Sequence, residues 1–184
     1  MKGFVLGLII GLLVLPLGGA LYVMTGHLPA AATDRPLPYE RKIAHIALNA
    51  RIRREAPDRD VSGLTTADLV AGAEIYVKDC AFCHGLPQQK PSPEGRGMFP
   101  RAPQLFAHGG VTDDPAGETY WKVKNGIRLT GMPSFGAALS DDEMWQVSAF
   151  LKRADKLPPE ALAALNPAPP VAPVQSVTGA KKPK

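Results

Sequence analysis

Two cysteines and a histidine lie within five consecutive positions of this chain, in the run Cys-Ala-Phe-Cys-His that ends at His84. Cys80 and Cys83 are the only cysteines among the 184 residues. Two thiols at this spacing can add across the two vinyl groups of a haem, and the adjacent imidazole can ligate its iron. The run is therefore interpreted as a covalent haem attachment site.

Two other kinds of site also use a Cys-x-x-Cys pair. A tetrahedral zinc site needs four ligands, and the sequence has no second cysteine pair to complete one. A thioredoxin-like dithiol would follow a strand within a βαβ pattern, which the sequence does not show. A disulfide between two such close cysteines would close only a small ring. Haem attachment is the interpretation that the rest of the chain favours.

A haem iron held by one histidine needs a sixth ligand, or it stays open to small molecules. The candidates are Met98, Met132, Met144, His45 and His108. Met132 is favoured, because its Thr-Gly-Met-Pro loop combines a flexible glycine with a stiff proline and lies far enough downstream to wrap around a haem. Met98 and His108 remain alternatives, whereas Met144 lies in an amphipathic pattern where methionine usually packs in the core. A thioether ligand would raise the reduction potential relative to two imidazoles.

The N-terminal region predicts a membrane anchor. Residues 4–24 are apolar and uncharged, and at about 1.5 Å per residue they can cross a bilayer of roughly 30 Å. Lys2 precedes this run and favours a cytoplasmic N-terminus with the rest of the chain exported. A cleavable signal peptide is the alternative, but its apolar region would be shorter. We assign residues 1–25 as a transmembrane anchor.

Residues 26–61 form a linker that contains one helical pattern, at residues 40–55. Residues 33–60 carry seven basic and five acidic side chains. The first interpretation is a solvated linker helix that packs on the main domain. The second is a helix that lies against anionic headgroups beside the anchor. The acidic side chains dilute the positive charge and favour the first.

Residues 62–157 carry three helical patterns and form the predicted compact domain. The first begins after Thr65 or Thr66 and leads into the cysteine pair, and the second occupies residues 115–125. The third follows Ser140, which forms a capping-box pattern with the glutamate three positions later. Because no strand pattern of useful length appears, the domain is predicted to be all-α.

Charge and composition limit the function further. Residues 62–156 hold ten Lys and Arg against eleven Asp and Glu, so they lack the concentrated basic face of a nucleic-acid binder. Residues 158–184 are rich in Pro, Ala and Val and hold few large apolar residues, so we expect a largely disordered tail.

Two segments resemble a class I monohaem c-type cytochrome. They are residues 72–84, GAEIYVKDCAFCH, and residues 125–132, NGIRLTGM. The last helical pattern, DDEMWQVSAFLKR, is similar to the C-terminal helix of that family. The resemblance covers roughly residues 64–155 and implies a cytochrome c-like helical fold around one haem c. In that family haem is attached outside the cytoplasm, which agrees with the predicted export.

The resemblance also implies roles for single residues. Cys80 and Cys83 would bind one haem c covalently, with His84 and Met132 as its iron ligands. The Pro103 carbonyl would accept a hydrogen bond from the His84 ring and make it more electron-rich. Pro100 is the alternative for that carbonyl.

The aromatic residues of the domain are expected to enclose the porphyrin. Gly72 and Tyr76 match the positions where the first helix of the family crosses the last, with Trp145 as the expected aromatic partner. Trp121 and Phe150 complete the expected enclosure. Alternatively, Trp121 or Arg128 would hydrogen-bond a haem propionate.

The predicted function is one-electron transfer by a membrane-tethered carrier between respiratory or periplasmic redox proteins. A six-coordinate iron leaves no vacant site, so no enzyme activity and no small-molecule substrate are expected. The expected location is the inner membrane, as a single-pass protein with the haem domain on the periplasmic side. The alternative is a fixed haem relay subunit of a larger oxidoreductase complex. A gas or redox sensor would need an exchangeable sixth ligand.

Overall fold

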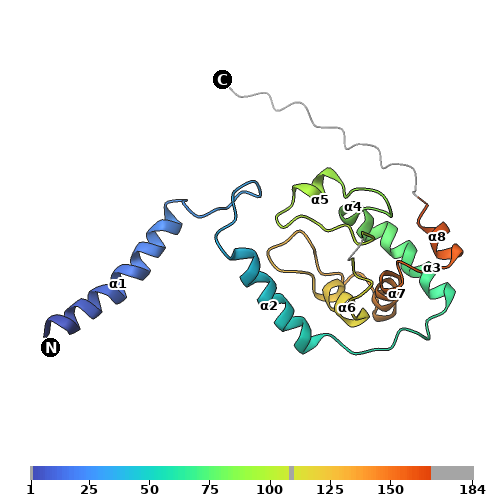
Figure 1. Cartoon of the computed structure of the whole chain (residues 1–184), viewed down its shortest axis with the longest axis horizontal. Helices are drawn as coiled ribbons and strands as arrows, with labels where there is room; N and C mark the ends of the chain where they lie inside the picture. Colours follow the sequence, from blue (N-terminus) through green and yellow to red (C-terminus); the bar gives the residue numbers. More distant parts are fainter. Residues whose placement is uncertain (1, 108–109, 167–184) are drawn as a thin grey trace, which may run out of the picture.

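The computed structural model describes residues 2–107 and 110–166, and this part of the chain is helical and contains no strand (Figure 1). The elements are α1 (Lys2–Met24), α2 (Glu40–Glu55), α3 (Thr66–Ile75), the π-helical turn η1 (Tyr76–Cys80), α4 (Ala81–His84), α5 (Pro93–Gly97), α6 (Ala116–Asn125), α7 (Asp141–Lys152) and α8 (Pro159–Ala164). The all-α prediction is confirmed.

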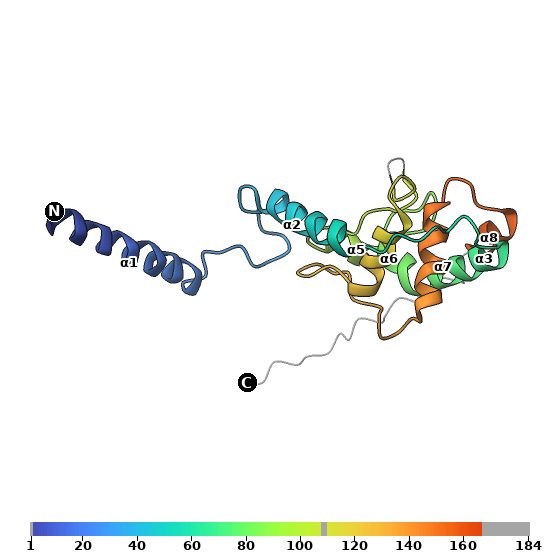
Figure 2. The ribbon, with the colours of Figure 1, turned by 90° about the horizontal axis from the view of Figure 1, so that it is seen from below.

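Helix α1 stands apart from the helical domain in both views (Figures 1 and 2). Its apolar side chains are exposed rather than packed against other elements. Among the described helices it alone is long and apolar enough to cross a membrane. An N-terminal signal sequence would share this length and composition.

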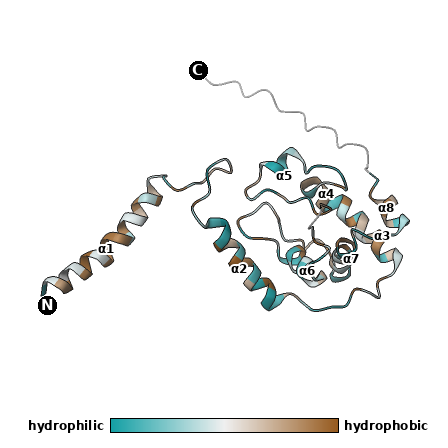
Figure 3. Ribbon diagram, viewed as in Figure 1, coloured by the Kyte–Doolittle hydropathy of each residue, from teal (hydrophilic) through white to brown (hydrophobic). Residues whose placement is uncertain are grey.

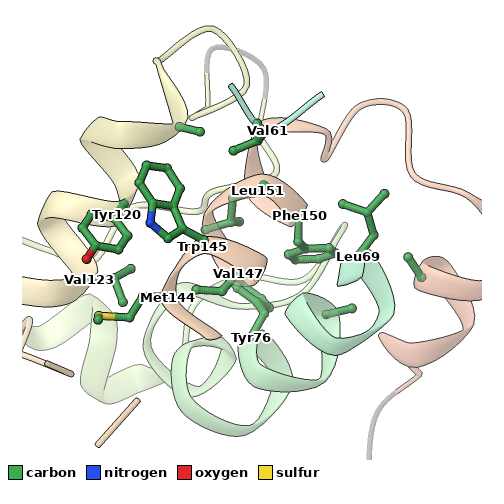
Figure 4. Close-up of a cluster of buried hydrophobic side chains, with 14 of the residues drawn as sticks. Val61, Leu69, Tyr76, Tyr120, Val123, Met144, Trp145, Val147, Phe150 and Leu151 are labelled. Atoms are coloured by element: carbon green, nitrogen blue, oxygen red, sulfur yellow. The ribbon is translucent and has the colours of Figure 1, made fainter. Parts of the chain in front are cut away.

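The core of the domain lies where α3 crosses α7, with α6 packed on the other side of α7 (Figure 4). The crossing is close because α3 has a glycine there: a Cβ at Gly72 would overlap the Gln146 carbonyl and lie 2.8 Å from Phe150 Cβ. The aromatic partner of Tyr76 at the crossing is Phe150, with ring centroids 5.7 Å apart. This corrects the expectation of Trp145, which instead stacks on Tyr120.

Both long helices of the crossing start with a capping box. Thr65 caps α3 with Asp68, and Ser140 caps α7 with Glu143; in each pair the two residues satisfy each other's backbone N–H groups. The sequence pattern at Ser140 predicted this start correctly. An N-cap of this kind contributes about 1 kcal/mol, so local sequence fixes where these helices begin.

The C-terminal segment differs from its prediction. The sequence analysis placed residues 158–184 in a disordered tail, but α8 is an ordered helix that packs on α3. Ala161 and Leu165 are buried in the core. One alanine and one leucine at the right spacing are enough to bury this short segment, and the composition of the whole tail did not show that packing. The rest of the predicted tail, residues 167–184, lies outside the described residues.

Helix α2 lies along the domain, and much of its ribbon has the hydrophilic colour in Figure 3. Its bounds match the predicted linker helix. Ile52 is buried, the Trp121 indole N–H donates to Glu55 at 3.3 Å, and the Arg41 guanidinium lies 5.3 Å from the centre of the Phe99 ring. The helix therefore contacts the domain near both of its ends.

Candidate haem site

The Cys-Ala-Phe-Cys-His run lies where the first helix of the domain changes its winding. Helix α3 widens into the π-helical turn η1, which ends at Cys80, and α4 then carries Cys83 and His84. π-Turns inside helices are rare and occur often at functional sites. Both cysteines are free and partly buried.

The ring of His84 is fixed by a residue far along the chain. His84 Nδ1 lies 2.7 Å from the Pro103 carbonyl oxygen. A carbonyl can only accept, so Nδ1 carries the proton and Nε2 keeps its lone pair. Burial lowers the pKa of His84, whereas the bond to Pro103 acts in the opposite direction. A neutral imidazole with a free Nε2 is the form that ligates a metal.

Tyr76 is bonded to the chain directly after the Cys-Ala-Phe-Cys-His run. It is fully buried, and its hydroxyl donates to the Gly85 carbonyl at 2.5 Å. The Phe106 ring meets it edge-on, with centroids 5.1 Å apart. Burial raises the pKa of Tyr76, with a further contribution from Cys80, so its hydroxyl stays a donor. The link between Tyr76 and Gly85 ties the helix to the chain just after His84.

Two residues that the sequence analysis missed close the following loop. Gln104 Nε2 donates to the carbonyls of Leu86 and Gln89, and its Oε1 accepts from the Phe106 amide. Gly95 lies against the backbone of Cys83, where a Cβ would overlap the Cys83 carbonyl. No motif in the sequence singles out these residues, because their roles depend on segments that meet only after folding.

Met132 lies in a loop that is fixed by its own backbone. Its carbonyl accepts from the Ile127 amide at 3.1 Å, and its amide donates to the Thr130 hydroxyl at the same distance. Thr130 Oγ1 in turn donates to the Ile127 carbonyl at 2.7 Å. Leu129, at the tip, has a positive φ and is 92% exposed. The Met132 side chain is half-buried.

The same loop attaches to the end of α6. Gly126 ends that helix with φ 67°, and a Cβ there would lie 2.9 Å from the Met132 carbonyl. The Ser134 hydroxyl donates to the last-turn carbonyl of Lys124 at 2.6 Å, and the Phe135 amide donates to Val123. Carbonyls in the last turn of a helix lack intrahelical partners, so the loop satisfies them.

The other candidate ligands fall in different places. Met98 lies beside the Met132 loop, where a Cβ at Gly131 would overlap its sulfur. Met144 is buried in the α7 core, as its pattern indicated, and His45 is exposed on α2. His108 lies outside the described residues. Met98 thus lies against Gly131, the residue directly before Met132.

Trp121 and Arg128 make no hydrogen bond or ion pair with the Cys-Ala-Phe-Cys-His run among the described residues. The Trp121 indole faces α2 and donates to Glu55. Arg128 is exposed in the Met132 loop, and no ion pair to it occurs in the described part of the chain. Trp121 also lines a cleft of about 470 Å³ between α2 and α6 that Tyr120 and Trp145 share.

The electrostatics at Cys80 keep its thiol protonated. Burial raises its pKa to about 12, with added contributions from Asp79 and Cys83. Asp79 Oδ2 is buried and has no hydrogen-bond partner among the described residues, and Lys78 Nζ lies 3.8 Å from it. The same residues contain no cluster of three or more His, Cys, Asp or Glu side chains arranged to hold a metal ion, as the zinc interpretation would need.

Comparison with protein families finds a match over the part of the chain that contains this site. Residues 67–151 match the family model described as cytochrome c oxidase, cbb3-type, subunit III. That stretch contains Cys80, His84 and Met132 together. The chain carries a c-type cytochrome domain. The domain is a haem electron carrier, and a c-type cytochrome binds its haem covalently.

Among solved structures, a chain of the reducing HAO-like protein complex of Kuenenia stuttgartiensis is similar to this chain. The two chains are 24% identical, with a TM-score of 0.43 over 55% of this chain and 52% of the other. This chain thus spans about half the length of that relative. No curated protein matches the sequence.

The residues present fit a covalently held haem. Two free thiols stand one helical turn apart, and the imidazole beside them has its Nε2 lone pair available. Gly95 leaves room for the backbone of α5 to lie directly on Cys83. Met132 offers a thioether on a loop whose backbone is fixed by hydrogen bonds.

Proposed function

We propose that the chain is a membrane-tethered one-electron carrier with one haem c. Cys80 and Cys83 would hold the haem, and His84 and Met132 would ligate its iron. When bound, such a haem supplies an iron that gains and loses one electron. The observation that carries this proposal is the contact between His84 Nδ1 and the Pro103 carbonyl, since it leaves Nε2 unprotonated.

The residues around the site would keep the ligands in one arrangement in both oxidation states. Pro103 orients the His84 ring and makes it more electron-rich. Tyr76 and Gln104 hold the chain on either side of it through bonds to backbone carbonyls. Thr130 holds the backbone of Met132. A site that moves little on gaining an electron transfers it with little reorganisation.

The domain organisation belongs to the same proposal. Helix α1 would stay in the inner membrane as the anchor, and the cytochrome domain would lie on the periplasmic side. Residues 26–61 would link the two, and the domain would extend through α8 because that helix is buried against α3. Redox proteins would be its partners, without an enzyme activity of its own.

The test of the ligand set compares the two neighbouring methionines. The Met132→Ala protein is expected to lose the weak far-red absorption band of a methionine–iron bond, and Met98→Ala is expected to keep it. The two sulfurs lie on adjoining loops, so a general disturbance of this region would affect both variants. A band that survives in Met132→Ala and disappears in Met98→Ala would overturn the assignment.

A second candidate function is a fixed electron relay within a larger complex. The matching family model is described as a subunit of an oxidase, which favours this reading. Purification of the full chain in mild detergent separates the two functions. A catalytic chain that co-purifies in a fixed ratio supports the relay, and a lone haem protein that exchanges electrons with soluble partners supports the carrier.

A further inference from the structure

Exposed apolar side chains gather in the segment that follows the candidate anchor. Outside α1, the large apolar residues exposed in this segment are Leu28, Leu37, Tyr39, Ile43 and Ile46. The rest of the described chain exposes only Phe82, Leu129 and Leu162 in this way. Contiguous exposed apolar surface marks an interaction site more often than scattered single residues do.

Helix α2 has two distinct faces, and only one of them contacts the domain. At 100° per residue, one side of the helix carries Arg41, Ile52 and Glu55. The Arg41 guanidinium lies over the Phe99 ring, Ile52 is buried, and Glu55 accepts a hydrogen bond from Trp121. Ile43 and Ile46 lie on the opposite side, 65% and 58% exposed. We call this second side, centred on Ile43, Ile46 and Ala50, the outer face of α2.

Basic side chains border the outer face. Lys42 and Arg53 lie along one edge, both exposed, and in the described part of the chain no carboxylate lies within ion-pair distance of either. On the other edge Arg51 and Arg54 pair with Glu55. These two arginines lower the pKa of Glu55 to about 2, so the carboxylate stays charged, and its Oε2 accepts from the Trp121 indole on the domain side. The outer face therefore exposes two isoleucines and an alanine and, among the described residues, has unpaired positive charge along the edge formed by Lys42 and Arg53.

The chain keeps this face close to α1. Fifteen residues separate Met24 from Glu40, a distance of about 50 Å at most if fully extended. The segment is far from extended, because Asp34 accepts from the amides of Ala30 and Ala31, and the Glu40 carboxylate accepts from the Leu37 amide. A bilayer that contains α1 would lie within reach of the outer face.

We propose that the outer face of α2 lies on an anionic lipid surface beside the anchor. This inference rests on the proposed role of α1 as a retained anchor. A helix with isoleucines on one face and Lys or Arg at its border binds the interface of acidic membranes, and tyrosines favour that level. Tyr39 stands 73% exposed directly before the helix.

The arrangement has a consequence for the cytochrome domain. One side of α2 would rest on lipid, while the other is attached to the domain through Ile52, Glu55 and Arg41. The domain would then meet its partners in one orientation above the membrane, rather than swing freely on a flexible stalk.

Photo-crosslinking in native membranes tests this inference on the full chain. Three proteins each carry p-benzoylphenylalanine at one site, in place of Ile43 on the outer face, Asn49 elsewhere on α2, or Val14 within α1. After irradiation, mass spectrometry identifies lipid or protein adducts. Lipid adducts are expected at positions 43 and 14, with a yield at 43 about fivefold or more above that at 49.

Every other outcome contradicts either the lipid contact of the outer face or the role of α1 as the anchor. Lipid adducts at 14 without any at 43 contradict the inference and leave the anchor in place. A protein adduct at 43 would mean that a partner protein covers the outer face, which also contradicts it. No lipid adduct at 14 would contradict the anchor itself. Equal yields at 43 and 49 would show that contact is not specific to the outer face.

Charge reversal tests the role of the basic border. Lys42→Glu combined with Arg53→Glu should reduce the lipid adduct at position 43 about fivefold or more, since each basic side chain near an anionic surface contributes to binding. The matched control reverses two exposed lysines of the domain, Lys90→Glu with Lys156→Glu, and should leave the yield unchanged. An equal loss in both double variants would contradict a specific role for the outer face.

Discussion

The two halves of the candidate site are held in different ways. On the His84 side, the fixing contacts join residues far apart in sequence: His84 to Pro103, and Gln104 to Leu86. On the Met132 side, the contacts are local, between Met132, Thr130 and Ile127, with anchoring bonds to the end of α6. The first half depends on the whole fold, and the second mainly on one loop.

This difference predicts how each half responds to damage. Long-range contacts form together with the core, so their loss lowers the stability of the entire domain. A surface loop can open alone, at a smaller free energy than global unfolding. We therefore expect changes on the His84 side to alter unfolding and iron coordination together. Changes on the Met132 side should alter coordination far more than unfolding.

The largest expected effect is at the helix crossing beneath the His84 side. Gly72→Ala adds a methyl group that overlaps the Gln146 backbone, which has no flexible atom to move aside. We expect a loss of about 3 kcal/mol or more in the free energy of unfolding, or failure to accumulate holoprotein. Denaturant unfolding of Gly97→Ala is the control, because nothing lies within 4 Å of a Cβ there. Equal stability of the two variants would contradict the crossing.

The next effect concerns the loop after His84. Gln104→Ala removes three hydrogen bonds to backbone groups, and we expect a loss of about 2 kcal/mol in the free energy of unfolding. Weaker iron coordination should accompany that loss. Gln89→Ala is the matched control, since only the Gln89 backbone carbonyl takes part. If Gln104→Ala weakens iron coordination without changing the free energy of unfolding, the contacts on the His84 side would be as local as those on the Met132 side.

A smaller and more local effect is expected at Thr130. Thr130→Val keeps the shape but removes the bonds to Ile127 and Met132, a change of about 1 kcal/mol. Imidazole should then replace the methionine ligand, seen as loss of the far-red band, at about fivefold lower concentration. The denaturant midpoint of unfolding should move little. A midpoint shift as large as that of Gln104→Ala would remove the distinction between the two halves.

The smallest effect is expected at the tip of the Met132 loop. Leu129 is 92% exposed, so Leu129→Ser should change the free energy of unfolding by less than about 0.5 kcal/mol. The methionine band should also remain. Thermal unfolding followed by haem absorption measures the stability, and the far-red spectrum before heating shows the methionine band. A large loss of stability would show that Leu129 packs against another part of the protein.

Local signals were read correctly from the sequence where a few neighbouring residues decide the structure. The capping box at Ser140, the end of α6 at Gly126 and the bounds of α2 are of this kind. The anchor candidate and the helical class also follow from local composition. The ligand set Cys80, Cys83, His84 and Met132 stays a prediction that the proposed spectra test.

Other features required the folded chain. Gln104 and Gly95 carry no motif, because their partners lie in segments that meet only in three dimensions. Phe150 rather than Trp145 meets Tyr76, since the helix crossing at Gly72 decides which side of α7 faces α3. Composition predicted disorder for the start of the tail, yet α8 is ordered by burial against α3.

The sequence by itself indicated the chemistry to expect of this protein: a haem attachment run, a choice of thioether ligands and an apolar helix before them. Reactivity and helix termini depend on residue type and short spacing, which a linear chain displays. The tertiary structure decided which carbonyl orients His84, which methionine lies against the Met132 loop, and which face of α2 remains uncovered. Those choices depend on the packing of distant segments, whose energies arise only when the chain is folded.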